Sequence, residues 1–293
     1  MIPELVRQWK ARARDRAVEV WRTRDIVSSP PGTNQVRRRG VALINPANEG
    51  LTGCANFPYF PKGGPVPPGA THNGKLRYAT SWGGMDAGPG MLYPSQTVDG
   101  TVHTLGGEDL ARACMRVKEV SPGVRCPIGN AVCTPPGGRR LCELYKAVVH
   151  TVPPFYQQYS KEDAEELLLS AYRNAFAQAW LHHTDTAPTG GWRWARGWVG
   201  SEKRGAEKPG NVRACATPLL GAGARGAPIE AAVRVAVIAA AEWIRGSAIS
   251  TSCHDVDAEN VLIFGIVDAE IADTLETALD QTLQCLHQEE EEI

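Results

Sequence analysis

The chain has 293 residues, of which 43% are hydrophobic and 22% are charged, and its formal net charge at pH 7 is −1. This length and apolar content suit one large domain or two small ones with a sizeable core. The near-zero net charge gives no global field that would attract nucleic acid or an acidic membrane. No window has the run of about 18 apolar residues that a membrane-spanning helix needs.

The basic N-terminal stretch lacks the apolar core of a secretory signal, and the acidic residues 289–292 read as a solvated tail. Residues 3–22 predict a helix, because Trp9, Ala13, Ala17 and Trp21 recur every four residues. The sequence that follows predicts a short strand that ends at residues 25–26.

Residues 41–45 predict a buried strand, since Val41, Leu43 and Ile44 are apolar. That strand runs without a polar transition into the segment 45–48, whose sequence is NPAN. Two amide side chains and a proline at the mouth of a sheet need an explanation.

Two stretches predict insertions in a single domain that covers residues 1–293. Residues 54–97 are crowded with proline and glycine and cannot form long helices. Residues 184–211 alternate tryptophan with arginine, which is typical of either a nucleic-acid stacking surface or an insertion that packs its tryptophans onto the domain. The near-neutral chain favours the packing interpretation, so we do not expect nucleic acid as a partner.

The rest of the chain alternates helices with apolar strands. We expect a helix over 106–117, an edge strand near 129–132, a buried strand over 147–152 and a helix capped by Ser160. A strand over 212–220, a helix with Pro228 in its first turn, a strand over 259–268 and a closing amphipathic helix complete the order. Strands that are apolar throughout predict an α/β fold with a largely parallel sheet covered on both faces.

Eight cysteines are present and none forms a CxxC pair. We therefore expect reduced thiols in an intracellular protein, cytoplasmic or nuclear. Cys54 with His72, and Cys253 with His254, offer the donor atoms of a zinc site but lack metal-ligand spacing. The sequence predicts no metal site and no cofactor.

Ligands of such sheets bind outside the carboxyl ends of the strands. Three unusual segments fall there: 45–48, the glycine-rich 221–226, and 265–268. Glycines let backbone N–H groups approach a ligand, and the following helix presents its positive end, so 221–226 predicts an anion cradle. The GxGxxG spacing within it is weak evidence alone and also fits an ordinary structural turn, and no GKS or GKT marks a P-loop.

The order of these motifs resembles the macrodomain family, whose members bind ADP-ribose. The sequence NPAN is similar to the family's "NAAN", VDGTVH at 98–103 to "VDGAIH", and CPIGNAVCTPPG to "GxAxxTxG". KAVVHTVPP is similar to "YVIHTVGP", TPLLGAGARGAPIEAAVRVA to the second phosphate loop and its helix, and RDIV to "GDIT". The matches keep the family's order from about residue 18 to 285.

This resemblance implies a three-layer α/β/α sandwich with a mixed, largely parallel central sheet. It also implies roles for matched positions. Asp25 would accept from the adenine amino group beside the backbone of Ile26, and the loop would hold the diphosphate with Gly221, Ala222, Gly223, Ala224, Arg225 and Gly226. Asn45 and Asn48 would form the floor and rim of the distal ribose site, and Asp99 would stand near the anomeric carbon.

The implied chemistry suits these side chains. A carboxylate at Asp99 can orient a water and stabilise an oxocarbenium-like ribose, and an uncharged amide can hold ribose hydroxyls without acting as a base. Purely structural interpretations also exist: Asn45 as a strand-end amide that satisfies backbone groups, Asp99 as a turn aspartate, and His103 as a core histidine.

The resemblance predicts an intracellular hydrolase that removes ADP-ribose from protein side chains or acts on O-acetyl-ADP-ribose, with no membrane partner. A non-catalytic module that binds ADP-ribose on modified proteins is the alternative. The chain departs from the family where an aromatic is replaced by Arg225, and a cation there would suit ADP-ribose 1″-phosphate. The family's first glycine loop is also remade within the insertion 54–97.

Overall fold

The structure is a computed structural model that describes residues 2–11, 16–32, 40–54, 60–61, 91–181, 212–246 and 260–289. The insertion predicted at 184–211 lies outside the described residues, as does most of 54–97. The two ends of the latter meet in a small antiparallel pair, β4 (Phe60–Pro61) with β5 (Met91–Leu92).

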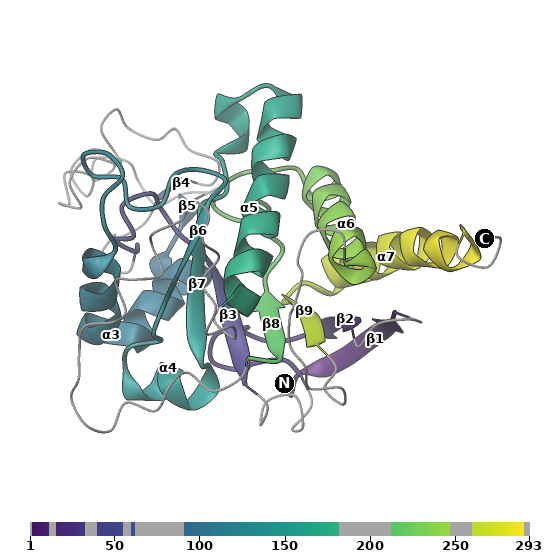
Figure 1. Cartoon of the computed structure of the whole chain (residues 1–293), viewed down its shortest axis with the longest axis horizontal. Coiled ribbons are helices and arrows are strands. Elements are labelled where there is room, and N and C mark those ends of the chain that lie inside the picture. Colours follow the sequence, from purple (N-terminus) through teal and green to yellow (C-terminus); the bar gives the residue numbers. More distant parts are fainter. Residues whose placement is uncertain are drawn as a thin grey trace.

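A seven-stranded sheet forms the centre of the molecule, in the order β1-β2-β9-β8-β3-β7-β6 (Figure 1). The edge strands β1 and β6 are antiparallel to their neighbours, and the strands between them are parallel. The strands are β1 (Glu4–Lys10), β2 (Arg16–Arg22), β3 (Val41–Pro46), β6 (Ala131–Thr134), β7 (Ala147–Thr151), β8 (Ala214–Thr217) and β9 (Asn260–Ile266). The expected mixed, largely parallel sheet is confirmed.

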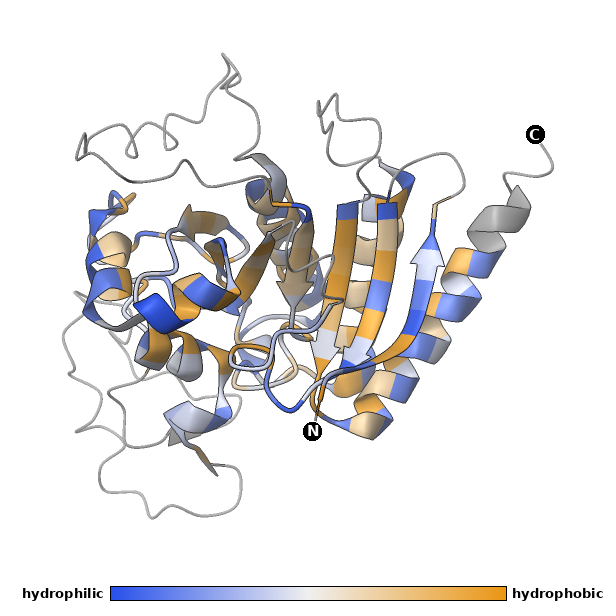
Figure 2. Cartoon of the chain, turned by 90° about the horizontal axis from the view of Figure 1, so that it is seen from below, coloured by the Kyte–Doolittle hydropathy of each residue, from blue (hydrophilic) through white to orange (hydrophobic). Residues whose placement is uncertain are grey.

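Helices cover both faces of this sheet. One face packs against α5 (Lys161–Leu181), α6 (Ile229–Arg245) and α7 (Ala269–Glu289), and the other against α3 (Val98–Arg116) and α4 (Arg139–Leu144). Successive strand residues alternate between the two cores: Ala42 and Ile44 join the first, Val41 and Leu43 the second. Figure 2 shows strands at the centre of the sheet that are largely orange, and a C-terminal helix that alternates orange and blue. This is the predicted three-layer sandwich.

The predicted N-terminal helix is wrong. Residues 4–10 and 16–22 form an antiparallel pair of strands, in which Trp9 lies opposite Val18 and Trp21 opposite Leu5. The predicted strand through 25–26 is also wrong, because β2 ends at Arg22 and a turn follows. Within β2, Val18 and Val20 face one core while Ala17 and Trp21 face the other, which is the two-residue period of a strand.

The chain reverses its side of the sheet at β3. The connection after β3 leads to α3 on one face, whereas β7 and β8 on either side of it lead to α5 and α6 on the opposite face. In open α/β sheets, ligands bind in the crevice outside the carboxyl ends of the strands at such a switch. The polar segment 45–48 follows β3 directly into this position. Among the described residues, no helix is long and apolar enough to cross a lipid bilayer.

Candidate functional site

The carboxyl ends of three neighbouring strands are tied together around one arginine. Arg225, in the glycine-rich loop after β8, donates from Nη2 to the carbonyl of Ala47 at 2.5 Å. The backbone N–H of Tyr156, in the segment after β7, donates to the carbonyl of Arg225 at 3.0 Å. Two of the segments predicted to meet at the sheet edge therefore do so.

Two internal hydrogen bonds close the glycine-rich loop, and its tip at Gly223 stays exposed. The N–H of Gly226 donates to Gly223 at 3.1 Å and the N–H of Ala227 to Gly221 at 3.0 Å. Gly221 and Gly226 have positive φ, and a Cβ added at the exposed Gly223 would meet no atom within 4 Å. The helix α6 begins just beyond, at Ile229. An open loop before a helix N-terminus is the geometry of an anion cradle.

Arg225 places a cation beside this loop. Its guanidinium lies over the ring of Phe155, 4.2 Å from the centroid. Desolvation lowers the pKa of Arg225 to about 10, against the charges of Asp99 and Glu49, which favour the protonated form. The side chain therefore stays charged at neutral pH. In turn, burial raises the pKa of Glu49 and the charge of Arg225 opposes that rise.

Asp99 lies in the first turn of α3 and is only 7% exposed. Thr97 caps the helix, since its Oγ1 accepts from the N–H of Gly100 at 3.1 Å. Gly100 has no room for a side chain, because a Cβ there would lie 2.1 Å from the carbonyl oxygen of Pro94. The glycine after Asp99 thus lets the preceding turn close onto the helix start and fixes where the carboxylate points.

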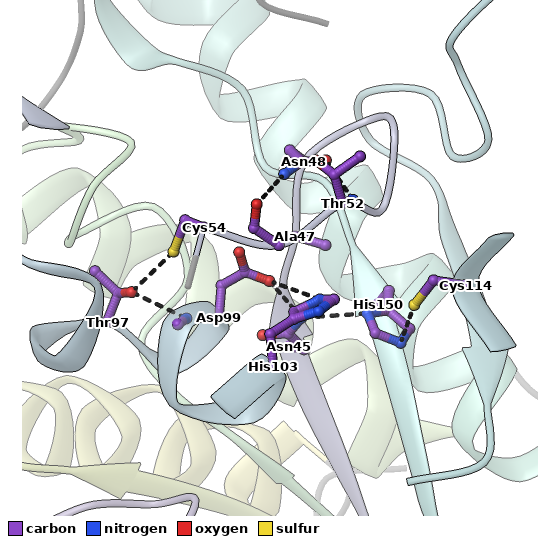
Figure 3. A network of polar contacts seen from close by, with 12 residues as sticks. Asn45, Ala47, Asn48, Thr52, Cys54, Thr97, Asp99, His103, Cys114 and His150 are labelled. Carbon is purple, nitrogen blue, oxygen red and sulfur yellow. Dashed lines mark hydrogen bonds and ion pairs between the residues drawn. The ribbon is translucent and has the colours of Figure 1, made fainter. Parts of the chain in front are cut away.

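A buried hydrogen-bond network positions the Asp99 carboxylate (Figure 3). Asn45, at the end of β3, donates from Nδ2 to Asp99 Oδ1 at 2.8 Å and lies 3.2 Å from Nδ1 of His150 on β7. His150 Nε2 is 2.8 Å from Thr134 Oγ1 on β6. Both Asn45 and His150 are fully buried. Asn45 therefore lies under the site, where it contacts Asp99, and not at the surface that a ligand would touch.

His103 adds a second imidazole to this network. Its Nε2 is 3.6 Å from Asp99 Oδ1 and has no hydrogen-bond partner among the described residues. Gly53, with φ of +67°, lies flat against the ring, since a Cβ there would be 2.4 Å from His103 Cγ. The ring is held between Gly53 and Asp99, which agrees with the structural interpretation of His103.

Cys54 and Asn48 complete the near side of the site. Burial, and secondly the charge of Asp99, raises the pKa of the Cys54 thiol, so it stays protonated, 3.4 Å from Thr97 Oγ1. The half-buried Asn48 uses its amide within its own turn: Oδ1 accepts from the N–H of Thr52 at 3.1 Å and Nδ2 donates to the Gly53 carbonyl at 3.3 Å. Its contact with a ribose stays a prediction.

The turn after β2 forms the distant end of the site. The Asp25 carboxylate accepts from the N–H of Val27 at 2.9 Å, and the Ile26 carbonyl accepts from the hydroxyl of Tyr145. Ile26 also packs on Gly265, where a Cβ would lie 2.8 Å from Ile26 Cδ1. This turn therefore lies beside the end of β9, the third predicted segment. The contact of Asp25 and Ile26 with adenine stays a prediction.

One group of side chains has the donor atoms of a metal site. Single donor atoms of His103, Cys114 and His150 lie within 4.8 Å of one another, and all three residues are buried. Both ring nitrogens of His150 already contact Asn45 and Thr134. The Cys114 thiol has its pKa raised by burial to about 12. The arrangement therefore fits a hydrogen-bond network better than a metal site. Of the zinc pairs considered above, His72, Cys253 and His254 lie outside the described residues.

Sequence reasoning missed His150 and Thr134. The available signal was a histidine in the middle of the apolar strand 147–152, where a polar side chain needs a buried partner. The partner, Asn45, was identified, but no pattern in one sequence pairs positions on two separate strands.

Comparison with known proteins gives one family. The profile described as "Macro domain" matches residues 89–236. A macro domain-containing protein of Caldanaerobacter subterraneus is 29% identical over 152 residues, which cover 52% of this chain and 67% of the relative. An O-acetyl-ADP-ribose deacetylase of Escherichia coli strain K12 is 37% identical over 78 residues, which cover 27% of this chain and 40% of the relative. A macro domain-containing protein of Cupriavidus necator is 38% identical, and the match spans 46% of its length.

Solved structures agree on the fold. The Oceanobacillus iheyensis macrodomain with ADP has a TM-score of 0.52 at 16% identity, and the match covers 97% of this chain and 98% of that one. A mutant of the same macrodomain with ADPR has a TM-score of 0.53 at 18% identity, with 95% and 100% covered. At this identity the likeness concerns the fold alone.

Proposed function

This chain belongs to the macrodomain family, and on that premise we propose that it binds ADP-ribose and hydrolyses ADP-ribosyl linkages at the distal ribose. Its substrates would be mono-ADP-ribosylated protein or O-acetyl-ADP-ribose. Two relatives support this proposal by their descriptions, a macrodomain solved with ADPR and an O-acetyl-ADP-ribose deacetylase.

The observation that carries the proposal is the setting of Asp99. A carboxylate that is 7% exposed lies at a helix start, next to the carboxyl end of β3, and accepts a hydrogen bond from Asn45. A merely structural turn aspartate would be exposed or would cap its own helix, but the capping is done by Thr97. Since Asp99 does not cap its helix, its buried carboxylate at the end of β3 favours a role toward a ligand.

We assign the ligand along the crevice. The turn at Asp25 and Ile26 would receive the adenine, and the loop 221–226 would hold the diphosphate. The loop offers glycine backbone, the start of α6 and the cation of Arg225, which together favour an anion. The distal ribose would then reach Asn48 and Asp99, because the bond from Arg225 to the Ala47 carbonyl holds the glycine-rich loop beside the residue that precedes Asn48.

The reaction follows from this placement. Asp99 would orient a water toward the anomeric carbon and stabilise the positive charge that develops as the bond to the acceptor carboxylate breaks. The water adds its oxygen to that carbon, its proton passes to Asp99, and the acceptor leaves with the bonding electron pair as a carboxylate. The products are ADP-ribose and the free acidic side chain.

Asp99→Ala tests the proposal. We expect turnover of mono-ADP-ribosylated protein to fall by at least 100-fold, on the scale of a lost general base, while calorimetry shows ADP-ribose affinity within about tenfold of the parent. Asp109→Ala is the matched control, because Asp109 lies on the same helix in an exposed ion pair with Arg112. Unchanged turnover in Asp99→Ala would sink the assignment of Asp99.

A binding module is the alternative outcome of the same experiment. Tight ADP-ribose binding by the parent chain, with no release of ADP-ribose from modified protein, would establish it and remove the hydrolase proposal.

Arg225 favours a second candidate, the hydrolysis of ADP-ribose 1″-phosphate. The guanidinium is held over Phe155 near Ala47, where a terminal phosphate on the distal ribose would lie. Release of phosphate from this substrate by the parent chain, reduced in Arg225→Gln by a larger factor than the affinity for ADP-ribose, would support it.

A further inference from the structure

We propose that His150 is a positioning residue, which acts through the Asn45 amide to aim it at Asp99. The catalytic part of this inference rests on the proposed hydrolase function. His150 itself is fully buried in β7 and does not reach the ligand. Its influence has to pass through Asn45.

The Asn45 amide nitrogen has two hydrogens and two acceptors. One acceptor is Asp99 Oδ1 at 2.8 Å and the other is His150 Nδ1 at 3.2 Å. His150 Nδ1 can accept only if it carries no proton, so the ring proton must lie on Nε2. That proton has an acceptor in Thr134 Oγ1 at 2.8 Å. The hydrogen-bond partners thus select one tautomer of the ring.

Asn45 Oδ1 is buried and has no hydrogen-bond partner among the described residues. A rotation of the amide by half a turn would place this oxygen against both the Asp99 carboxylate and the lone pair of His150 Nδ1. The ring could answer by moving its proton to Nδ1, with the Thr134 hydroxyl donating to Nε2, so the Asp99 carboxylate is the acceptor that excludes the reversed orientation. With the amide held this way, His150 Nδ1 accepts the second amide hydrogen, and removal of the ring leaves that hydrogen without a partner.

His150 stays uncharged down to low pH, so its Nδ1 remains an acceptor for the Asn45 amide. Burial, and secondly the nearby His103, lowers the pKa of His150 to about 3. The groups that face the ring are His103 and Cys114 on α3, Thr134 on β6 and Asn45 on β3. None of them offers a carboxylate that would favour a protonated imidazole.

The first test is the tautomer. Nitrogen NMR of the parent protein with labelled histidine should show His150 with an unprotonated Nδ1 and a protonated Nε2. A protonated Nδ1 would overturn the inference at once, and this result does not depend on whether the protein is a hydrolase.

The second test uses two variants that each keep half of the ring. His150→Asn keeps a γ-attached acceptor where Nδ1 lies, and His150→Gln keeps only a polar group in the place of Nε2. We expect His150→Gln to lower kcat at least tenfold and His150→Asn to lower it no more than about threefold, with ADP-ribose affinity in both within about threefold of the parent. In the parent we expect the Asn45 side-chain N–H protons to exchange slowly with solvent. This protection should be lost only in His150→Gln.

Equal losses of kcat in both variants, with unchanged Asn45 signals, would show a merely structural role and overturn the inference. If either variant fails to fold, Thr134→Val replaces it. This change removes the acceptor of Nε2–H and should lower kcat about threefold, whereas Thr134→Ser should not. Equal kcat in these two variants would count against the inference. If the parent shows no turnover at all, the hydrolase proposal fails, and the tautomer and the Asn45 signals still decide the positioning.

Discussion

Arg225 connects two loops at the edge of the sheet. It stacks on Phe155 and bonds to Ala47, so it joins the glycine-rich loop to the end of β3. A side chain that holds two loops also contributes to the stability of the fold, in addition to any contact with a ligand.

We expect Arg225→Gln to lower the free energy of unfolding by about 1 to 2 kcal/mol, since it removes a cation–π contact and a charged hydrogen bond to a carbonyl. Urea denaturation would measure this change. Arg234→Gln, which breaks an exposed ion pair between Arg234 on α6 and Glu165 on α5, should cost less than about 1 kcal/mol. Equal effects of the two substitutions would show that Arg225 does not tie the loops together.

Some residues of the site could be predicted from the sequence, and others could not. Asp99, Asn45 and Asn48 lie in short contiguous motifs, so the sequence alone could propose them. His150 and Thr134 act only because β7 lies next to β3 and β6 in the sheet, and strand order is a long-range property. The Asn45 amide donates to Asp99, because the register of β3 buries it, and its contact with a ligand stays a prediction.

At the scale of elements, the start of α3 depends on Gly100. A Cβ there would lie 2.1 Å from the backbone oxygen of Pro94, so either the preceding turn or the helix start must move.

We expect Gly100→Ala to destabilise the fold by about 1 to 3 kcal/mol, which is typical of overpacking, and to lower turnover because Asp99 is displaced. Thermal denaturation and the hydrolysis assay would measure the two effects. Gly223→Ala is the matched control for the denaturation measurement alone, since a Cβ there meets open space in the protein and the residue does not have positive φ. A stable and active Gly100→Ala would contradict the role given to this close approach.

The N-terminal hairpin shows where local pattern fails. A spacing of four residues fits one face of a helix, but four is also an even number, so it fits one face of a strand equally well. The sequence AVEVW within β2 alternates β-branched residues with others, which favours a strand. The expectation of a helix gave the spacing of Trp9 and Trp21 more weight than this composition, and the two tryptophans lie on different strands.

At the scale of the whole molecule, the alternation of apolar strands and helices was enough to predict the three layers. The buried histidine between those layers gives the fold a dependence on pH. In the unfolded chain His150 takes a proton near its usual pKa of 6.5, whereas burial lowers its pKa in the folded protein to about 3.

The direction of this pH dependence follows from the number of protons that the folded and unfolded states bind. Between these two values the unfolded chain holds a proton that the folded protein does not, so the free energy of unfolding falls as pH falls. The loss is at most about 1.4 kcal/mol per pH unit. Urea denaturation at pH 6.5 and pH 5 should show about 1 to 2 kcal/mol more loss in the parent than in His150→Asn. An equal loss in both proteins would contradict the low pKa.

The pairing of the sheet's early and late strands sets an order of assembly. During synthesis β2 appears long before its parallel partner β9. The hairpin is then clasped by α7, through Arg7 with Glu276 at 3.0 Å and Trp9 with Asp280 at 3.1 Å. On the ribosome the first strands must therefore wait, with their apolar residues unburied, until the last ones emerge, and this edge of the molecule is where a nascent chain would most need a chaperone.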